Sequence, residues 1–149
     1  MTQKQPFIYL DHIADIRFIA YGKTIETLFE NAAKAMLTVI ADIEAIQPEN
    51  KFDVELETDS LENLMVDFLS ELLFLFDSEE TVIGNVDVKK IEQKNKGGNE
   101  KYSIVAAVSG EPINSNKQNF KTEVKAVTYN GIRVEKTTEG YETEVVLDL

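Results

Sequence analysis

Two stretches of the chain carry apolar residues at the spacing of a helix with one buried face. In residues 25–40 they recur every three or four positions, and Thr24 stands where a capping residue belongs. The same pattern runs through residues 61–76, where either Asp59 or Ser60 can cap the first turn. We therefore predict two main helices, each with one face turned toward a core.

The other apolar segments have the pattern of β-strands. In residues 52–56 apolar and acidic residues alternate, which indicates a strand buried on one face. Asn95–Asn99, with two central glycines, predicts a hairpin turn, and Asn130-Gly131 allows either a tight turn or a bulge. Residues 111–120 predict a polar loop that is either mobile or meets a partner. The predicted strands are 52–56, 86–93, 102–108, 122–136 and 141–149.

The order of these elements predicts the fold class. Strands at both ends of the chain with helices between them are typical of an α+β domain. A chain of 149 residues with 43% hydrophobic residues can bury one core, so we expect a single domain over residues 1–149.

Composition narrows the functional classes. The chain has 27 acidic against 15 basic residues, a net charge of −12, which disfavours tight nucleic-acid binding and favours a basic protein partner or a divalent cation. It has no cysteine, which excludes disulfides and thiolate metal sites and suits the cytoplasm, where we expect the protein. We expect no secretion signal and no membrane span, because charged or polar residues interrupt every apolar run.

The two ends of the chain hold the candidate metal ligands. Asp11, His12 and Asp15 fall within five residues, and Asp148 stands beside the α-carboxylate of Leu149. If the β-segment that opens the chain, around Asp15, and the last β-segment are neighbours, Asp15, Asp148 and that α-carboxylate can converge as oxygen ligands suited to Ca²⁺, Mg²⁺ or Mn²⁺. The alternative is that these aspartates are turn residues or solvated, and a lone histidine is more commonly structural than a ligand.

Lys125 is the other candidate. In a strand, Glu123, Lys125, Val127 and Tyr129 would share a face, so the lysine lies either on the solvated face, which is the default, or toward an acidic pocket. The chain has no phosphate-binding loop, no dinucleotide fingerprint, no nucleophile elbow and no zinc-protease motif.

Taken together, these segments resemble the archease family. The similarity covers nearly the whole chain in the family's order and spacing, with an opening of the form DHxAD, a TEVKAxTY segment and a terminal LDx. The segments that carry it are Tyr9–Asp15, Ala20–Thr24, Leu28–Met36, Leu61–Phe76, Gly110–Pro112, Thr122–Tyr129 and Leu147–Leu149.

The resemblance implies a fold, a site and an activity. The fold has β-layers enclosing a layer of helices. The site is a divalent-metal centre at Asp15 and Asp148, joined by the Leu149 carboxylate, with Ca²⁺ expected and Mg²⁺ or Mn²⁺ as alternatives. Lys125 corresponds to the family's functional lysine, and Asp11 and His12 would have supporting roles.

The activity implied is that of an accessory protein rather than an enzyme. Such a protein stimulates guanylylation and multiple turnover of an RtcB-type ligase, which joins RNA ends bearing 2′,3′-cyclic phosphate or 3′-phosphate in tRNA splicing and RNA repair. Ile13 and Asn130 depart from the family's usual threonine and histidine, which affects hydrogen bonding around the site. The alternatives are a small metal-dependent phosphoester hydrolase using the same carboxylates, and a chaperone-like binding module.

Overall fold

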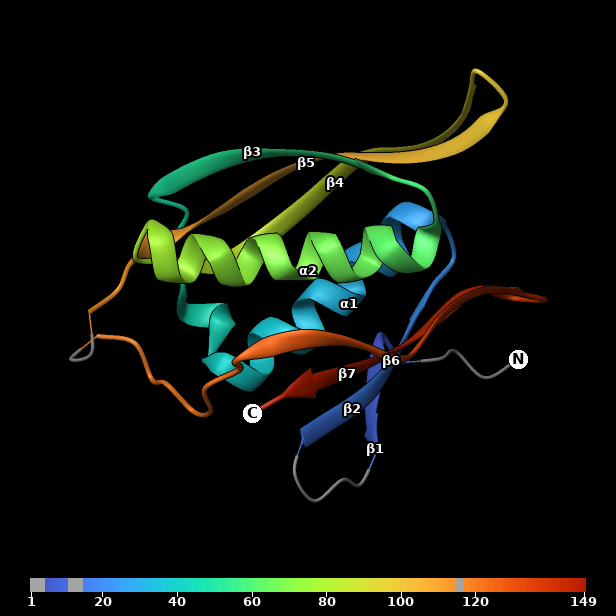
Figure 1. Cartoon of the computed structure of the whole chain (residues 1–149). Coiled ribbons are helices and arrows are strands. Elements are labelled where there is room, and N and C mark those ends of the chain that lie inside the picture. Colours follow the sequence, from blue (N-terminus) through green and yellow to red (C-terminus); the bar gives the residue numbers. More distant parts are fainter. Residues whose placement is uncertain (1–4, 11–14, 115–116) are drawn as a thin grey trace.

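Two helices lie side by side between two antiparallel β-sheets in the computed structural model of the chain, which describes residues 5–10, 15–114 and 117–149 (Figure 1). One sheet has the strand order β1-β2-β7-β6 and the other β3-β5-β4. This arrangement confirms the predicted α+β class and the layer of helices between β-layers. The elements are β1 (Phe7–Leu10), β2 (Asp15–Gly22), α1 (Ile25–Ile40), a 3-10 helix (Ile43–Ala45), β3 (Asn50–Thr58), α2 (Leu61–Ser78), β4 (Thr81–Lys96), β5 (Asn99–Pro112), β6 (Ala126–Thr137) and β7 (Gly140–Asp148).

Both helices begin at the residues that the sequence marks as caps. The Thr24 hydroxyl accepts a hydrogen bond from the Thr27 N–H at 3.1 Å, and the Ser60 hydroxyl accepts one from the Asn63 N–H at 3.0 Å. Each bond satisfies a backbone donor that has no partner within the first turn. Ser60 rather than Asp59 is therefore the cap of α2. None of the helices in the described part of the chain has both the length and the apolarity needed to cross a bilayer.

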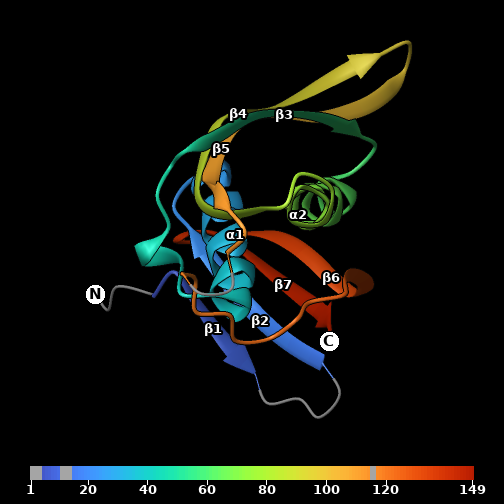
Figure 2. The same ribbon diagram turned by 90° about the vertical axis from the view of Figure 1, so that its left-hand side faces the viewer.

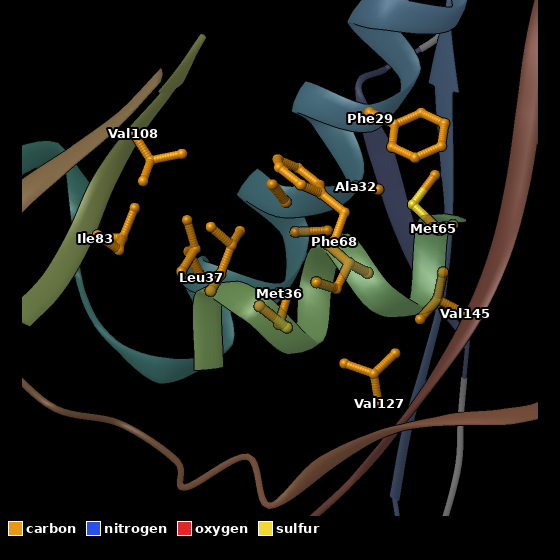
Figure 3. Packing of buried hydrophobic residues seen from close by; sticks show 14 of the residues in the cluster. Phe29, Ala32, Met36, Leu37, Met65, Phe68, Ile83, Val108, Val127 and Val145 are labelled. Atoms are coloured by element: carbon orange, nitrogen blue, oxygen red, sulfur yellow. The ribbon is translucent and has the colours of Figure 1, made fainter. Parts of the chain in front are cut away.

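The core lies where the helices meet the two sheets (Figure 3). The rings of Phe29 in α1 and Phe68 in α2 lie 6.1 Å apart, and both side chains are fully buried. Ile83 and Val108 face this layer from one sheet, and Val145 faces it from the other. The apolar stripes of the helices thus join both sheets into a single core.

The glycine at Asn130-Gly131 belongs to a bulge rather than to a tight turn. Thr128 of β6 is paired with Val146, and the next paired residue, Arg133, lies opposite Glu144. The extra residues of β6 leave the ladder there, and Gly131 has φ +69°, a backbone conformation that a side chain disfavours. Beyond the bulge β6 pairs with β7 again as far as Thr137.

The sequence pattern provided no bounds for β1 and β2, and three of the bounds that it predicted differ from the structure by four residues or more. β4 begins at Thr81 rather than near residue 86, because a bulge between Ile83 and Asn85 breaks its period of two. β5 extends to Pro112, so residues 111 and 112 belong to a strand and not to the polar loop. β6 begins at Ala126 rather than residue 122: the preceding segment pairs with the end of α1, where the Lys121 N–H donates to the Ile40 carbonyl at 2.8 Å.

We predict that Phe68→Ala lowers the free energy of unfolding by about 3–5 kcal/mol, because it leaves a cavity where the helices pack against each other. Phe74→Ala, the same change on an exposed side chain of the same helix (56% exposed), should cost less than about 1 kcal/mol. Urea unfolding followed by circular dichroism measures both. Equal decreases for the two variants would contradict the assigned core.

Candidate metal centre

Asp15 and Asp148 are directly opposite each other on neighbouring strands. Asp15 opens β2, Asp148 closes β7, and the two are cross-strand partners in the antiparallel ladder. On the other side of β7, Ala126 is the partner of Asp148, and the Lys125 N–H donates to the Asp148 carbonyl at 2.8 Å. The opening β-segment that contains Asp15 and the last β-segment are therefore neighbours, as convergence of the two aspartates requires (Figure 1).

The two carboxylates face away from the helices. Residues directly opposite in an antiparallel pair project from the same side of the sheet, with Cβ atoms about 4.5–5.5 Å apart. Leu147, the neighbour of Asp148, is fully buried in the core, so Asp148 and its partner Asp15 lie on the outer face. Asp15 is half-buried and Asp148 is exposed.

Like charges in this arrangement repel and favour a cation. Further along the same face the charges are balanced: Arg17 pairs with Glu144 at 3.3 Å, and Arg133 pairs with Glu142 at 2.7 Å. The row of Asp15, Asp148 and Ala126 contains two acids and no basic side chain. Protonation or a bound cation relieves the repulsion of such a pair, and hard oxygen donors suit Ca²⁺, Mg²⁺ or Mn²⁺.

The residues present fit part of such a site. Two carboxylates supply at most about four of the six to eight oxygens that Ca²⁺ takes, and within residues 5–10, 15–114 and 117–149 no group of three acidic or histidine side chains gathers around one point. Backbone carbonyls and water would provide the remainder. The predicted contribution of the Leu149 carboxylate stays a prediction, and Asp11, His12 and Ile13 lie outside the described residues.

Lys125 has an exposed side chain beside this row. The predicted sharing of a face with Val127 was wrong: Val124 and Val127 are buried while Lys125 is exposed, because the segment before Ala126 is not a strand. The default expectation, a solvated lysine, is correct for the side chain. Its backbone is nevertheless bonded to Asp148, so the lysine is attached at the strand end that carries one of the two carboxylates.

A buried glutamate holds the segment that leads to Lys125. Glu111 is 2% exposed, and its carboxylate accepts hydrogen bonds from Gln118 Nε2 and the Gln47 N–H, at 3.0 and 3.3 Å. Lys117 Nζ forms an ion pair with it at 3.0 Å. The hydrogen bond from Gln118, followed by the Lys117 contact, lowers the pKa of Glu111 below its ordinary value. Residues 111–120 were expected to form a polar loop that is either mobile or meets a partner; Glu111, Lys117 and Gln118 instead hold part of it to the body.

Sequence reasoning missed this anchor and a neighbouring depression. Glu111 stands between Gly110 and Pro112 at a strand end, a signal that contributes to the family resemblance but does not by itself reveal a buried carboxylate. Between α2 and residues 120–125 lies a depression of about 360 Å³, in which the rings of Phe76 and Phe120 meet edge to face at 6.0 Å. Its other lining residues are Ile40, Leu73, Asp77, Lys121, Thr122, Glu123, Val124 and Lys125.

Comparison with known proteins assigns the family. The sequence model of the Archease protein family (MTH1598/TM1083) matches residues 7–149. The chain belongs to the archease family. It is 45% identical to the archease of Methanosarcina mazei over 99% of both chains, and 38% identical to that of Thermococcus kodakarensis over 89% of both. The solution structure of Methanobacterium thermoautotrophicum protein 1598 is similar, with a TM-score of 0.79 at 30% identity, covering 97% of this chain and 99% of that one.

We predict that the Glu111 anchor makes stability depend on pH in the acidic range. A carboxyl whose pKa is lowered by folding stabilises the fold above its unfolded pKa, and that stabilisation disappears as pH falls through the folded pKa. The difference in unfolding free energy between the wild type and Glu111→Gln should therefore be largest near neutrality and shrink below the ordinary glutamate value of 4.5. Chemical denaturation across this range measures it. A difference that stays constant with pH would contradict the assigned role.

Proposed function

We propose that this protein is the accessory factor of an RtcB-type RNA ligase, and that it stimulates guanylylation and multiple turnover of that enzyme. Membership of the archease family supports the proposal. The structural observation that carries it is the single row in which Asp15 faces Asp148 and the Lys125 backbone is bonded to Asp148. This row gathers, from three distant parts of the sequence, the residues to which the family resemblance assigns function.

In this proposal Asp15 and Asp148 hold one divalent cation, with Ca²⁺ as the expected ion and Mg²⁺ or Mn²⁺ as alternatives. Their two oxygen-bearing side chains share one face of the sheet, and Leu149 follows directly after β7. The bound cation supplies positive charge that cancels the repulsion of the two carboxylates. The ends of β2 and β7 are then fixed relative to the segment of Lys125.

The role proposed for Lys125 follows from its exposure. Its side chain is exposed while its backbone is bonded to Asp148, so the ammonium can meet a carboxylate of the ligase, or a phosphate bound to it, without burying an unpaired charge. The segment that carries it is held by Glu111 and by the end of α1. Such anchoring reduces the conformational entropy that partner binding removes.

The net charge of −12 favours association with a positively charged ligase surface. An acidic protein is attracted over long range to a basic, RNA-binding ligase, which raises the association rate at low salt. We place this interaction in the cytoplasm. The depression beside Lys125, lined by Leu73, Phe76 and Phe120, offers apolar surface for close contact with the ligase.

Joining of a 3′-phosphate RNA by the cognate ligase, with GTP, metal and excess substrate, tests the proposal. Substoichiometric amounts of this protein should raise joining from about one turnover per ligase to many, since an activator that is released acts repeatedly. No change in turnover together with no binding to the ligase would overturn the proposal. Hydrolysis of phosphoesters by the purified chain alone, abolished in Asp15→Ala, would replace it with the hydrolase alternative.

The cation site generates a prediction on stability. At about one hundred times its dissociation constant, Ca²⁺ should stabilise the wild type by about 2.7 kcal/mol, and Asp148→Asn should abolish most of this stabilisation. Without metal, Asp148→Asn should be neutral or stabilising by up to about 1 kcal/mol, because it removes a like-charge pair. Thermal unfolding with and without Ca²⁺ measures both effects.

Asp53→Asn is the matched control for that experiment, since Asp53 is an exposed strand aspartate on the other sheet. It should leave the Ca²⁺ stabilisation unchanged. An equal decrease in the two aspartate variants would show a diffuse effect of surface charge rather than a site.

Lys125→Gln should abolish most of the stimulation of the ligase while leaving the Ca²⁺-dependent stabilisation intact, because its ammonium acts on the partner and not on the fold. Lys51→Gln removes the same charge from an exposed residue of β3, on the other sheet, and should retain most of the stimulation. Multiple-turnover joining measures both. Equal stimulation by Lys125→Gln and the wild type would remove Lys125 from the mechanism.

A further inference from the structure

The hairpin of β4 and β5 projects beyond the rest of its sheet (Figure 1 and Figure 2). β3 accompanies β5 only as far as the pair Thr58–Tyr102, while β4 and β5 continue together to Lys96–Asn99. The last residues form a two-stranded ribbon closed by Gly97 and Gly98, both of which have positive φ. Residues 93–100 are all exposed. This ribbon and its base, residues 89–101, form the basic hairpin.

The basic hairpin is net positive, whereas the rest of the molecule is net negative. Residues 89–101 contain five lysines and two glutamates, whereas the remaining residues contain ten basic and 25 acidic side chains. A third of the protein's positive charge is thus concentrated in one projecting element. The field that repels a polyanion from the body is locally opposed there.

Three of these lysines share one face of the ribbon. Lys94 and Lys96 alternate along β4, and Lys101 lies directly opposite Lys94 on β5. Neither Lys94 nor Lys101 forms an ion pair with another residue in the described part of the chain, whereas Lys96 Nζ lies 2.7 Å from a Glu57 carboxylate oxygen. A hydrogen bond from Lys96, with the charges of Lys101 and Lys94 added to it, lowers the pKa of Glu57. The positive charges of Lys94, Lys96 and Lys101 therefore add up at one site on the ribbon.

A like-charge pair opposite in a hairpin costs stability unless an ion of the other sign lies between its members. For Lys94 and Lys101 that ion would be an anion. For the carboxylate pair of Asp15 and Asp148, in the other sheet, it would be a cation. Alternate residues of a strand are about 6.4–6.8 Å apart, a spacing comparable to that of successive phosphates in an extended nucleic-acid strand. Asn99, directly opposite Lys96, adds an amide donor on the same face of the ribbon.

We propose that the basic hairpin contacts the phosphate backbone of single-stranded RNA through Lys94, Lys96 and Lys101. Lysines on a ribbon are mobile point charges, so the contact is independent of base sequence, weak and sensitive to salt. This goes beyond the proposed function, which assigns the protein a ligase partner and no RNA contact of its own. Tight RNA binding stays disfavoured by the acidic body.

The test is a titration of the isotope-labelled full chain with a short oligouridine strand, followed by the shifts of its backbone amide resonances. No ligase and no divalent metal are present, so failure here leaves the proposed function untouched. Shifts should concentrate in residues 89–101, and affinity should fall as salt is raised. In the triple variant with Lys94, Lys96 and Lys101 changed to Gln, the slope of log affinity against log salt should fall by roughly 2, because each phosphate neutralised by a lysine contributes about 0.7.

The matched control removes the same charge from exposed lysines elsewhere, by changing Lys23, Lys34 and Lys51 to Gln. It should keep the wild-type shifts in the basic hairpin. No shifts with oligouridine, shifts centred elsewhere, or equal weakening in both triple variants would each overturn the proposal. Equal shifts with a polyglutamate of matched charge would also overturn it, in favour of an acidic protein segment as the partner.

Discussion

The pairing of β2 with β7 is the contact on which the candidate site depends. Eight consecutive pairs, from Asp15–Asp148 to Gly22–Tyr141, fix the register of the two strands. A slip of one residue would turn Phe18 or Leu147, both fully buried, toward solvent and would separate the two aspartates. Because exposing Phe18 or Leu147 to water is unfavourable, the register is maintained, and it keeps Asp15 opposite Asp148 although the two carboxylates repel each other.

The patterned parts of the fold followed from local chemistry. Period and capping predicted the helices, since the apolar stripe and Thr24 or Ser60 act within a few residues. Convergence of the two chain ends was predicted only as a condition, because a strand pattern does not specify its partner. The anchor at Glu111 joins Gln118 and Lys117, close in sequence, to Gln47, 64 residues away, and the late start of β6 depends on a contact with the distant Ile40. No local pattern reports such distant contacts.

Two parts of the molecule carry like-charged cross-strand pairs of opposite sign, one acidic and one basic. Asp15 and Asp148 are cross-strand partners where β2 begins and β7 ends. Lys94 and Lys101 are cross-strand partners in the basic hairpin. Each pair is unfavourable in isolation and becomes favourable with a ligand of opposite sign. Elsewhere on the outer face of the same sheet, Arg17 and Arg133 form ion pairs with glutamates of β7.

Titration with substoichiometric Mn²⁺ tests the assignment of the carboxylate row most directly, because a paramagnetic ion broadens the amide resonances nearest to it. The account predicts selective broadening around Asp15, Ala126 and Asp148, reversed by excess Ca²⁺ and absent in Asp148→Asn. Broadening spread evenly over the acidic surface, or centred away from the junction of β2 and β7, would contradict it.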